Sequence, residues 1–381
     1  MGKRKRIGLV FSLDKNWIGG SYYILNLISA LGTLPEDKQP VIVILSKNQN
    51  DFRAARQTKY RFLKYRNPFD FKRSLFEAAV NTAFKMFFRK DLIDKRISAK
   101  HIDVLFPANN NACFDKVKNK VYWFPDFQHT FYPEFFSKTE MDLRNSIIEE
   151  ISTHLQKLIL SSNAAKNDYK TSFASVTNKL HVVPFAVTHP ELHHIRISDL
   201  LKEYHIDSEY FIISNQFWKH KNHMVVFQAI KKLSYQGVKY QFVFTGQEND
   251  NRDPGYFQTL KDFIEDNQLA GFVKMLGLID RHKQLKLMQF SKAVIQPSLF
   301  EGWSTVVEDA KALGKLVIAS NIAVHKEQLV SGVYFFNPFA SDELVEKIEQ
   351  SIVQPSINSS LDYKKNVIEF GETFMSVIET P

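Results

Sequence analysis

Short apolar runs alternate along the chain with longer stretches in which apolar positions recur at helical spacing. The runs predict strands at 6–11, 41–46, 102–107, 121–124, 157–162 and 180–185, and again at 210–215, 240–246, 272–277, 292–297 and 315–320. The stretches between them predict helices near 19–31, 139–153, 163–173, 222–236, 254–267, 281–290 and 304–313, with a last helix at 363–379. This alternation is typical of parallel sheets whose two faces are covered by helices.

The alternation falls into two sets that meet near Pro184–Pro190. A chain of 381 residues is long enough to bury two separate cores. We therefore expect an α/β protein with two doubly wound, Rossmann-like domains that face each other across a cleft. The predicted boundaries are 1–187 for the N-terminal domain, 188–360 for the C-terminal domain and 361–381 for the last helix.

Four polar segments directly follow predicted strands, and open parallel sheets bind their ligands at these strand ends. Each segment also has a plain interpretation, as a glycine turn, a histidine packed among aromatic rings, an exposed basic loop or a solvated turn acid. If they line a common site, its candidate residues are Gly19 and Gly20 after 6–11, Asp126 and His129 after 121–124, Lys219 and Lys221 after 210–215, and Glu301 after 292–297.

The segment after strand 292–297 has the pattern of a glycine turn followed by a helix. A helix N-terminus presents unpaired N–H groups and binds anions. Glu301 and Asp309 flank this helix start, and carboxylates accept hydrogen bonds from sugar hydroxyls. A ligand with both a diphosphate and hydroxyl groups, such as a nucleotide sugar, would satisfy both features. The alternative is that the helix dipole favours acids here without any ligand.

The stretch Glu301–Asp309, EGWSTVVED, resembles the signature of family 4 of the retaining GT-B glycosyltransferases, in which seven residues separate two glutamates. Asp309 stands at the second acidic position, and Trp303 and Ser304 replace the usual Phe and Gly. Glu308 lies about 100° away around the helix and cannot take the place of Asp309. Three further segments resemble the family's N-terminal glycine loop, its active-site His segment and its basic donor-phosphate loop: Trp17–Ser21, Pro125–His129 and Ser214–His223.

The resemblance implies a metal-independent transfer of a sugar from a nucleotide-diphosphate sugar, with retention of configuration. It places Glu301 on hydroxyls of the donor sugar and Asp309 on the ribose. Lys221, with Lys219 as the second cation, would hold the diphosphate and stabilise its growing negative charge. Backbone N–H groups in the turn would receive the β-phosphate and sugar oxygens, and this turn comprises Gly302, Trp303, Ser304 and Thr305.

The other two segments are expected to contact the donor or the acceptor. Gly19 and Gly20 let the backbone approach a donor phosphate or the acceptor closely. His129 is expected to hydrogen-bond the donor sugar or the acceptor, and Asp126 to orient His129 or contact the acceptor. Neither is assigned as the base, because the leaving phosphate is thought to help take the proton in this family. The chain has no Asp-x-Asp pair and no Cys/His ligand spacing, so we expect no metal and no cofactor besides the donor substrate.

The net charge of +9 is concentrated in residues 52–100, which hold 14 Lys/Arg and 4 Asp/Glu, or +10, and leave −1 for the rest. From Leu75 to Phe88, apolar residues recur in pairs every four positions, which predicts one apolar helix face. Two interpretations stay open: a helix packed on the N-terminal domain with a solvated basic side, or an interfacial helix on an anionic membrane. Nucleic acid is not expected as a partner, because no nucleic-acid module is recognised.

Cys113 is the only cysteine, so no intrachain disulfide can form and a reducing compartment is expected. No apolar run approaches the length of a spanning helix. We therefore expect a cytoplasmic protein, peripheral on the inner face of the membrane if segment 52–100 binds lipid. The resemblance implies a glycan or lipid-linked acceptor, as in bacterial surface polysaccharide biosynthesis, and a last helix that returns to the N-terminal domain. The alternatives are a catalytically silent GT-B-like binding subunit and a sugar-nucleotide epimerase on the same fold.

Overall fold

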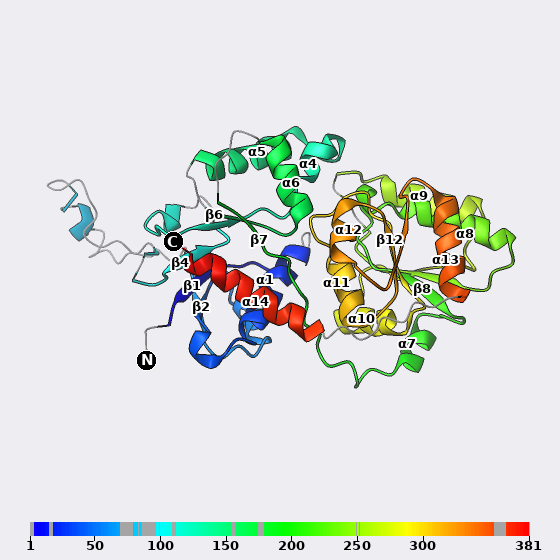
Figure 1. The fold of residues 1–381 in the computed structure, drawn as a ribbon, viewed down its shortest axis with the longest axis horizontal. Helices are drawn as coiled ribbons and strands as arrows, with labels where there is room; N and C mark the ends of the chain where they lie inside the picture. Colours follow the sequence, from blue (N-terminus) through cyan, green and yellow to red (C-terminus); the bar gives the residue numbers. More distant parts are fainter. Residues whose placement is uncertain are drawn as a thin grey trace.

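The computed structural model describes residues 4–14, 18–68, 79–82, 84–85, 97–98, 100–108, 112–153, 157–173, 179–248, 250, 252–353 and 363–380. They form two α/β domains side by side, each with a parallel sheet and helices packed on it (Figure 1). The predicted fold class is therefore confirmed.

The N-terminal domain has a four-stranded and a three-stranded sheet, with orders β3-β2-β1-β4 and β5-β6-β7. A parallel bridge between Leu105 and Lys120 joins the two sheets, which gives one succession of strands from β3 to β7. The strands are β1 (Arg6–Val10), β2 (Val41–Leu45), β3 (Leu63–Arg66), β4 (Val104–Phe106), β5 (Val121–Trp123), β6 (Lys157–Leu160) and β7 (Lys179–Val182). The helices are α1 (Ile18–Leu31), α2 (Gln49–Arg56), α4 (Gln128–Phe131), α5 (Lys138–Thr153) and α6 (Asn163–Ser172).

The C-terminal domain has one six-stranded parallel sheet of order β10-β9-β8-β11-β12-β13. The strands are β8 (Tyr210–Ile213), β9 (Gln241–Phe244), β10 (Val273–Met275), β11 (Val294–Gln296), β12 (Val317–Ser320) and β13 (Val333–Phe336). The helices are α7 (Ile197–Glu203), α8 (His223–Tyr235), α9 (Tyr256–Asp266), α10 (Arg281–Phe290), α11 (Thr305–Ala312), α12 (Ala323–Gln328) and α13 (Ser341–Val353). The strand order reverses between β8 and β11, which is the switch point where such sheets bind ligands.

The burial of the strands explains which ones the sequence pattern predicted. Every residue of β8, β9 and β12 is buried, because helices cover both faces, and apart from Gln241 and Ser320 these strands are apolar. The pattern did not predict β3 or β13, which lie at the edges of their sheets and are mostly half-buried. The predicted bounds of the other strands and of helices α5, α6, α8, α9, α10 and α11 agree with the structure to within a few residues.

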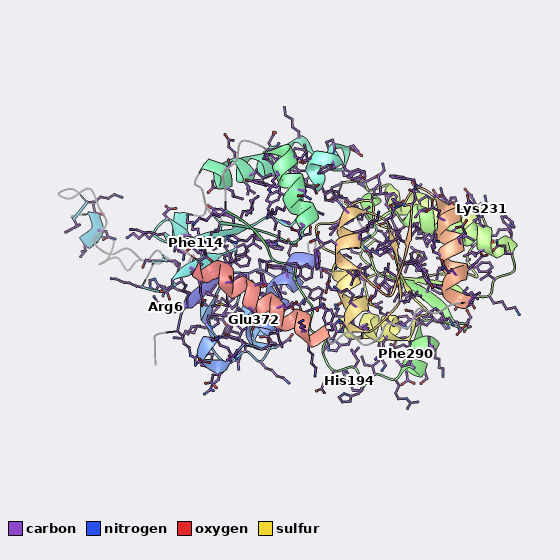
Figure 2. All side chains as sticks on the ribbon, viewed as in Figure 1. Arg6, Phe114, His194, Lys231, Phe290 and Glu372 are labelled. Carbon is purple, nitrogen blue, oxygen red and sulfur yellow. The ribbon has the colours of Figure 1, made fainter. Side chains whose placement is uncertain are left out.

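The last helix, α14 (Tyr363–Glu379), packs against α1 of the N-terminal domain, beside which it lies in Figure 1. Phe370, Phe374 and Ile378 are buried in the N-terminal core. A Cβ atom on Gly371 would lie 2.7 Å from the Ala30 carbonyl oxygen, so only glycine allows this close approach of the two helices. Figure 2 shows Glu372 of the same helix over the N-terminal domain.

Most of the predicted basic helix over 75–88 lies outside the described residues. Residues 79–82, 84 and 85 are described, and they are helical. The choice between packing and lipid contact for segment 52–100 stays open. Among the helices that are described, none is both long and apolar enough to cross a membrane.

Candidate functional site

A cavity of about 500 Å³ lies between the two domains, within the size range of small-molecule sites. The N-terminal domain contributes the first turns of α1, the loop after β5 and part of α5. The C-terminal domain contributes the loops after β8, β9 and β11 and the starts of α10 and α11. All four polar segments predicted from the sequence contribute residues to this cavity, so the fold brings them to one place.

Glu301 and Lys221 meet at the switch point, because Glu301 follows β11 and Lys221 follows the neighbouring β8. Lys221 Nζ lies 2.6 Å from Glu301 Oε1. The same oxygen accepts hydrogen bonds from Gln296 Nε2 at 2.9 Å and from Ser298 Oγ at 2.8 Å. Oε2 has no hydrogen-bond partner among the described residues, so it is the atom available to a ligand.

The charge of Glu301 depends on its neighbours. Burial raises the pKa of the Glu301 carboxyl, but the Lys221 ammonium, His325 and the hydrogen bonds from Lys221 and Ser298 outweigh burial and hold this pKa below its usual value. His325 is itself fully buried, which lowers its pKa to about 4. His325 is therefore neutral at pH 7, and Lys221 is the cation that keeps Glu301 ionised.

Helix α11 begins behind Glu301 with unpaired N–H groups at the cavity. Ser304 caps the helix, and its hydroxyl accepts a hydrogen bond from the Val307 N–H at 3.4 Å. Its φ of −86° is open to any residue, so serine fits where the family has glycine. The N–H groups of Thr305 and Val306 have no acceptor within the described part of the chain, and both residues line the cavity. An anion can bind at this helix end.

The Ser304 N–H is already engaged. It donates to Gln328 Oε1 at 3.2 Å, and Gln328 Nε2 donates to the Ser304 carbonyl at 2.8 Å and to Glu308 Oε1 at 2.9 Å. The expectation that the Ser304 N–H receives a phosphate or sugar oxygen is therefore not met in this arrangement. Glu308 faces Gln328 and α14 and does not line the cavity, as its position around the helix predicts.

The Asp309 carboxylate is buried in the cavity wall between two basic side chains. Its Oδ1 lies 2.5 Å from Arg281 Nη2 and 2.9 Å from His189 Nε2. Burial raises the pKa of Asp309, but the Arg281 charge and the hydrogen bonds from Arg281 and His189 lower it by more. The pKa of Asp309 therefore lies below its usual value. Oδ2 is buried without a hydrogen-bond partner in the described structure. A ligand hydroxyl would satisfy this oxygen.

At Gly302 the backbones of the two domains approach each other closely along the cavity wall. A Cβ atom at this position would lie 1.9 Å from the Pro125 carbonyl oxygen and 3.0 Å from Asp126 Cβ. The next residue, Trp303, donates its indole N–H to the Phe185 carbonyl at 3.0 Å. The close neighbour that requires glycine at 302 is therefore the N-terminal domain.

Asp126 lines the cavity, and His129 does not. Asp126 Oδ1 accepts a hydrogen bond from Arg144 Nη1 at 3.4 Å. The His129 side chain is fully buried, with ring centroids of Phe124 and Phe136 6.0 Å and 6.2 Å away. Burial lowers the pKa of His129. His129 thus fits the plain interpretation, a histidine packed among aromatic rings, and the expectation that it contacts donor or acceptor is not met.

Gly19 and Gly20 lie in the first turn of α1 and line the cavity. A Cβ atom on Gly19 would meet no atom within 4 Å, so the space beside it is open. Lys219 lies outside the cavity, with an exposed side chain whose Nζ is 3.7 Å from Asp253 Oδ2. The expectation that Lys219 is the second diphosphate cation is therefore not met by its placement.

Three arginines that the sequence analysis did not single out line the cavity: Arg144 of α5, Arg252 in the loop after β9, and Arg281 of α10. They come from separate elements and share no local motif, so only the fold reveals them as a group. Each is paired with an aspartate of the same cavity, Arg144 with Asp126 at 3.4 Å, Arg252 with Asp250 at 2.9 Å and Arg281 with Asp309 at 2.5 Å.

Among the residues that the structure describes, no group of three or more His, Cys, Asp or Glu side chains is placed to hold a metal ion. The metal-independent reaction stays a prediction.

Comparison with known proteins agrees with this geometry. Residues 201–370 match the family model of glycosyl transferases group 1. The trehalose synthase of Pyrococcus horikoshii is 25% identical over 186 residues, which are 48% of this chain and 45% of that protein. The chain thus matches about half the length of this curated relative.

Similar solved structures cover the whole chain. Anabaena Alr3699/HepE in complex with UDP and glucose has a TM-score of 0.68 and 16% identity, over 100% of both chains. A glycosyltransferase from Rickettsia africae has a TM-score of 0.65 and 13% identity, over 99% of this chain and 96% of the other. An E. coli structure described as trehalose-6-phosphate bound with UDP-2-fluoro glucose has a TM-score of 0.64 and 12% identity, over 99% of this chain and 100% of the other. The chain therefore has the GT-B fold, and its residues 201–370 match the family model of glycosyl transferases group 1.

Proposed function

We propose that this chain is a retaining, metal-independent glycosyltransferase that moves a hexosyl or deoxyhexosyl group from a nucleotide-diphosphate sugar to a glycan or lipid-linked acceptor. The observation that carries the proposal is the buried Glu301–Lys221 pair at the switch point, beside the free N–H groups of α11 and inside a cavity shared by both domains. A role in bacterial surface polysaccharide biosynthesis suits the basic segment 52–100, whose charge favours an anionic membrane with lipid-linked acceptors.

The donor would lie along the C-terminal wall of the cavity. The N–H groups of Thr305 and Val306, together with Lys221, would hold the diphosphate. Glu301 Oε2 would accept a hydrogen bond from a hydroxyl of the donor sugar, and Asp309 Oδ2 one from the ribose. The free donor and acceptor atoms at the cavity wall support these proposed positions.

In the proposed reaction, the bond from the anomeric carbon to the β-phosphate oxygen breaks, and a bond from that carbon to the acceptor oxygen forms on the same face. The acceptor proton goes to the leaving phosphate, as the resemblance to retaining enzymes of this fold implies, and His129 lies outside the cavity. Lys221 and the α11 N–H groups would stabilise the negative charge that develops on the diphosphate.

The first test is sugar transfer and donor hydrolysis by wild type and by Glu301→Gln. UDP-glucose is the first donor to try, since the similar Anabaena protein was solved in complex with it. We expect Glu301→Gln to lose about 10²–10³-fold in rate, the usual cost of removing one group that stabilises the transition state. Glu349→Gln, an exposed acid on α13, is the control and should keep full activity.

Two further measurements separate the finer parts of the proposal. The anomeric configuration of the product, read by NMR, tests retention. Activity after treatment with a chelator tests metal independence. Equal rates for wild type and Glu301→Gln would contradict the assignment of Glu301, whatever the product.

A catalytically silent binding subunit is the second candidate, favoured by the state of the cavity cations. Lys221, Arg144, Arg252 and Arg281 are each paired with a carboxylate, so an incoming diphosphate must compete with these carboxylates. Titration calorimetry with UDP, GDP and dTDP distinguishes the two candidates. Binding of one of them supports a donor site, and binding of none favours the silent subunit.

A further inference from the structure

Two arginine–aspartate pairs, one from each domain, flank the ring of Phe136 in the cavity. The Arg144 guanidinium carbon lies 4.9 Å from the ring centroid, and that of Arg252 lies 5.6 Å from it. Arg144 is paired with Asp126 of its own domain, and Arg252 makes two hydrogen bonds to Asp250, at 2.9 Å and 3.1 Å. All five side chains line the cavity, and their arrangement requires both domains.

This cluster lies next to the loop that contains Glu301 and Gly302. A Cβ atom on Gly302 would lie 3.0 Å from Asp126 Cβ, and Asp126 is the partner of Arg144. The diphosphate and ribose positions proposed above use other residues of the cavity, namely Lys221, the first N–H groups of α11 and Asp309. The cluster is therefore placed to hold the molecule that receives the sugar, an inference that rests on the proposed function.

The charges of the cluster do not favour an anion. Hydrogen bonds from the Ser137 backbone and hydroxyl, and then the charges of Arg252 and Arg144, hold the pKa of Glu140 below its usual value, although burial opposes them. Glu140 is thus a third carboxylate in the cavity beside two guanidinium groups. A carboxylate or phosphate on the ligand would have to displace Asp126 or Asp250, whose side chains are 25% and 5% exposed, and would leave that charge without its partner.

An uncharged hydroxyl group has no such cost. It can donate to an aspartate and accept from the arginine beside it while the pair stays intact. Trp218 adds an apolar surface, since its ring lies 4.6 Å from the Arg252 guanidinium carbon and also lines the cavity. A sugar ring has hydroxyl groups, which the paired aspartates and arginines can hydrogen-bond. It also has C–H surfaces, which can pack on the aromatic rings.

We propose that the two arginine–aspartate pairs and the rings of Phe136 and Trp218 form a subsite for an uncharged sugar unit of the acceptor, which is completed only when the C-terminal domain brings Arg252 against Phe136.

The test compares simple saccharides as acceptors for the full-length protein. Release of nucleoside diphosphate from the donor is measured with water alone, with uncharged methyl glycosides, and with the same sugars carrying a carboxylate or a phosphate. We expect the uncharged glycosides to accelerate release more than the charged ones. Preference for a charged analogue, or no acceleration by any uncharged glycoside, would overturn the proposal.

Variant Arg252→Met tests the contribution of the C-terminal domain. We expect the KM for the saccharide to rise about tenfold or more, the equivalent of one hydrogen bond to a charged group, and to rise by a larger factor than the Kd for nucleoside diphosphate. The control is Arg61→Met, because Arg61 also pairs with an acid and lies 5.4 Å from a phenylalanine ring, but outside the cavity. An unchanged saccharide KM in Arg252→Met refutes the subsite. If wild type neither binds nor hydrolyses any donor, the proposed function itself fails.

Discussion

The carboxylate of Glu301 shows how one neighbouring atom fixes the charge of a buried residue. Its side chain is 9% exposed, and burial alone would favour the protonated form. The Lys221 ammonium at 2.6 Å reverses this preference, since the nearby His325 is neutral at pH 7. At the residue scale, Lys221 thus has two roles: it sets the charge of Glu301, and it is the proposed cation for the diphosphate.

We predict that Lys221→Met lowers the free energy of unfolding by about 3–5 kcal/mol at pH 7, because it leaves a buried carboxylate without its partner. In wild type the pKa of folded Glu301 lies below that of the unfolded chain, so its ionised form stabilises the fold above the unfolded pKa. This stabilisation is lost as the pH falls through the folded pKa. In the variant the pKa of Glu301 rises, so the deficit should shrink as the pH falls toward about 4.

Urea unfolding of both proteins at several pH values measures this effect. Lys232→Met is the control, since Lys232 pairs with an exposed Asp342 and should cost only about 0–1 kcal/mol. A Lys221→Met deficit that stays constant between neutral and acidic pH would contradict the assignment.

At the scale of elements, α14 connects the N-terminal core to the helix that carries the proposed donor site. The Tyr363 hydroxyl donates to Glu308 Oε2 on α11 at 2.5 Å and accepts from the Val187 N–H at 3.0 Å. Glu308 in turn is hydrogen-bonded to Gln328, which holds both backbone groups of Ser304. The first turn of α11 is therefore fixed through α14, an element that is distant in sequence.

We predict that Tyr363→Phe weakens nucleoside diphosphate binding about tenfold, because removal of the hydroxyl leaves Glu308 Oε2 without this hydrogen bond and loosens the first turn of α11. Tyr60→Phe is a matched control, since the buried Tyr60 hydroxyl makes one hydrogen bond, to the Pro40 carbonyl at 2.7 Å, away from the cavity. Tyr60→Phe should lose about 1 kcal/mol of stability, and Tyr363→Phe about 1.5–3 kcal/mol, because the Tyr363 hydroxyl donates to a carboxylate. Calorimetry then separates them, and equal affinities in the two variants would show that Tyr363 is only structural.

At the scale of the whole molecule, several contacts hold the two domains together around the cavity. Gly302 lies against Pro125, Trp303 donates to Phe185, and Glu327 of α12 accepts hydrogen bonds from the first N–H groups of α6 at 2.8 Å and 3.0 Å. With these contacts formed, the two domains are in a closed arrangement around the cavity.

We predict that Gly302→Ala prevents this closed arrangement. Its Cβ would overlap the Pro125 carbonyl oxygen at 1.9 Å, and because the atoms on both sides of this contact are backbone, we expect the domains to separate. Small-angle scattering should show a larger radius of gyration. The rate of sugar transfer should fall about tenfold or more, because misplaced reacting groups react more slowly. Gly271→Ala, whose Cβ would meet nothing within 4 Å, should change neither quantity. Unchanged scattering for Gly302→Ala would mean that the loop adapts locally.

The sequence predicted the order of the elements well, because helices cover both faces of the central strands and each strand therefore appears as an apolar run. It did not predict the edge strands β3 and β13, where half-burial weakens that signal. It also placed Glu301, Lys221 and Asp126 near one site, since loops after parallel strands share an edge. His129 and Lys219 were assigned with them, because sequence position alone does not tell which way a loop side chain points.

The sequence by itself thus determined two Rossmann-like domains and the helix end behind Glu301, because burial and hydrogen-bonding demands act over a few neighbouring residues. Only the tertiary structure decided which charges meet. The partners of Asp309 are 28 and 120 positions away in the chain, and Gly302 is required by a carbonyl of the other domain. Charge pairing and steric contact depend on distance in space, and distance in space between separate elements is fixed only when the whole chain has folded.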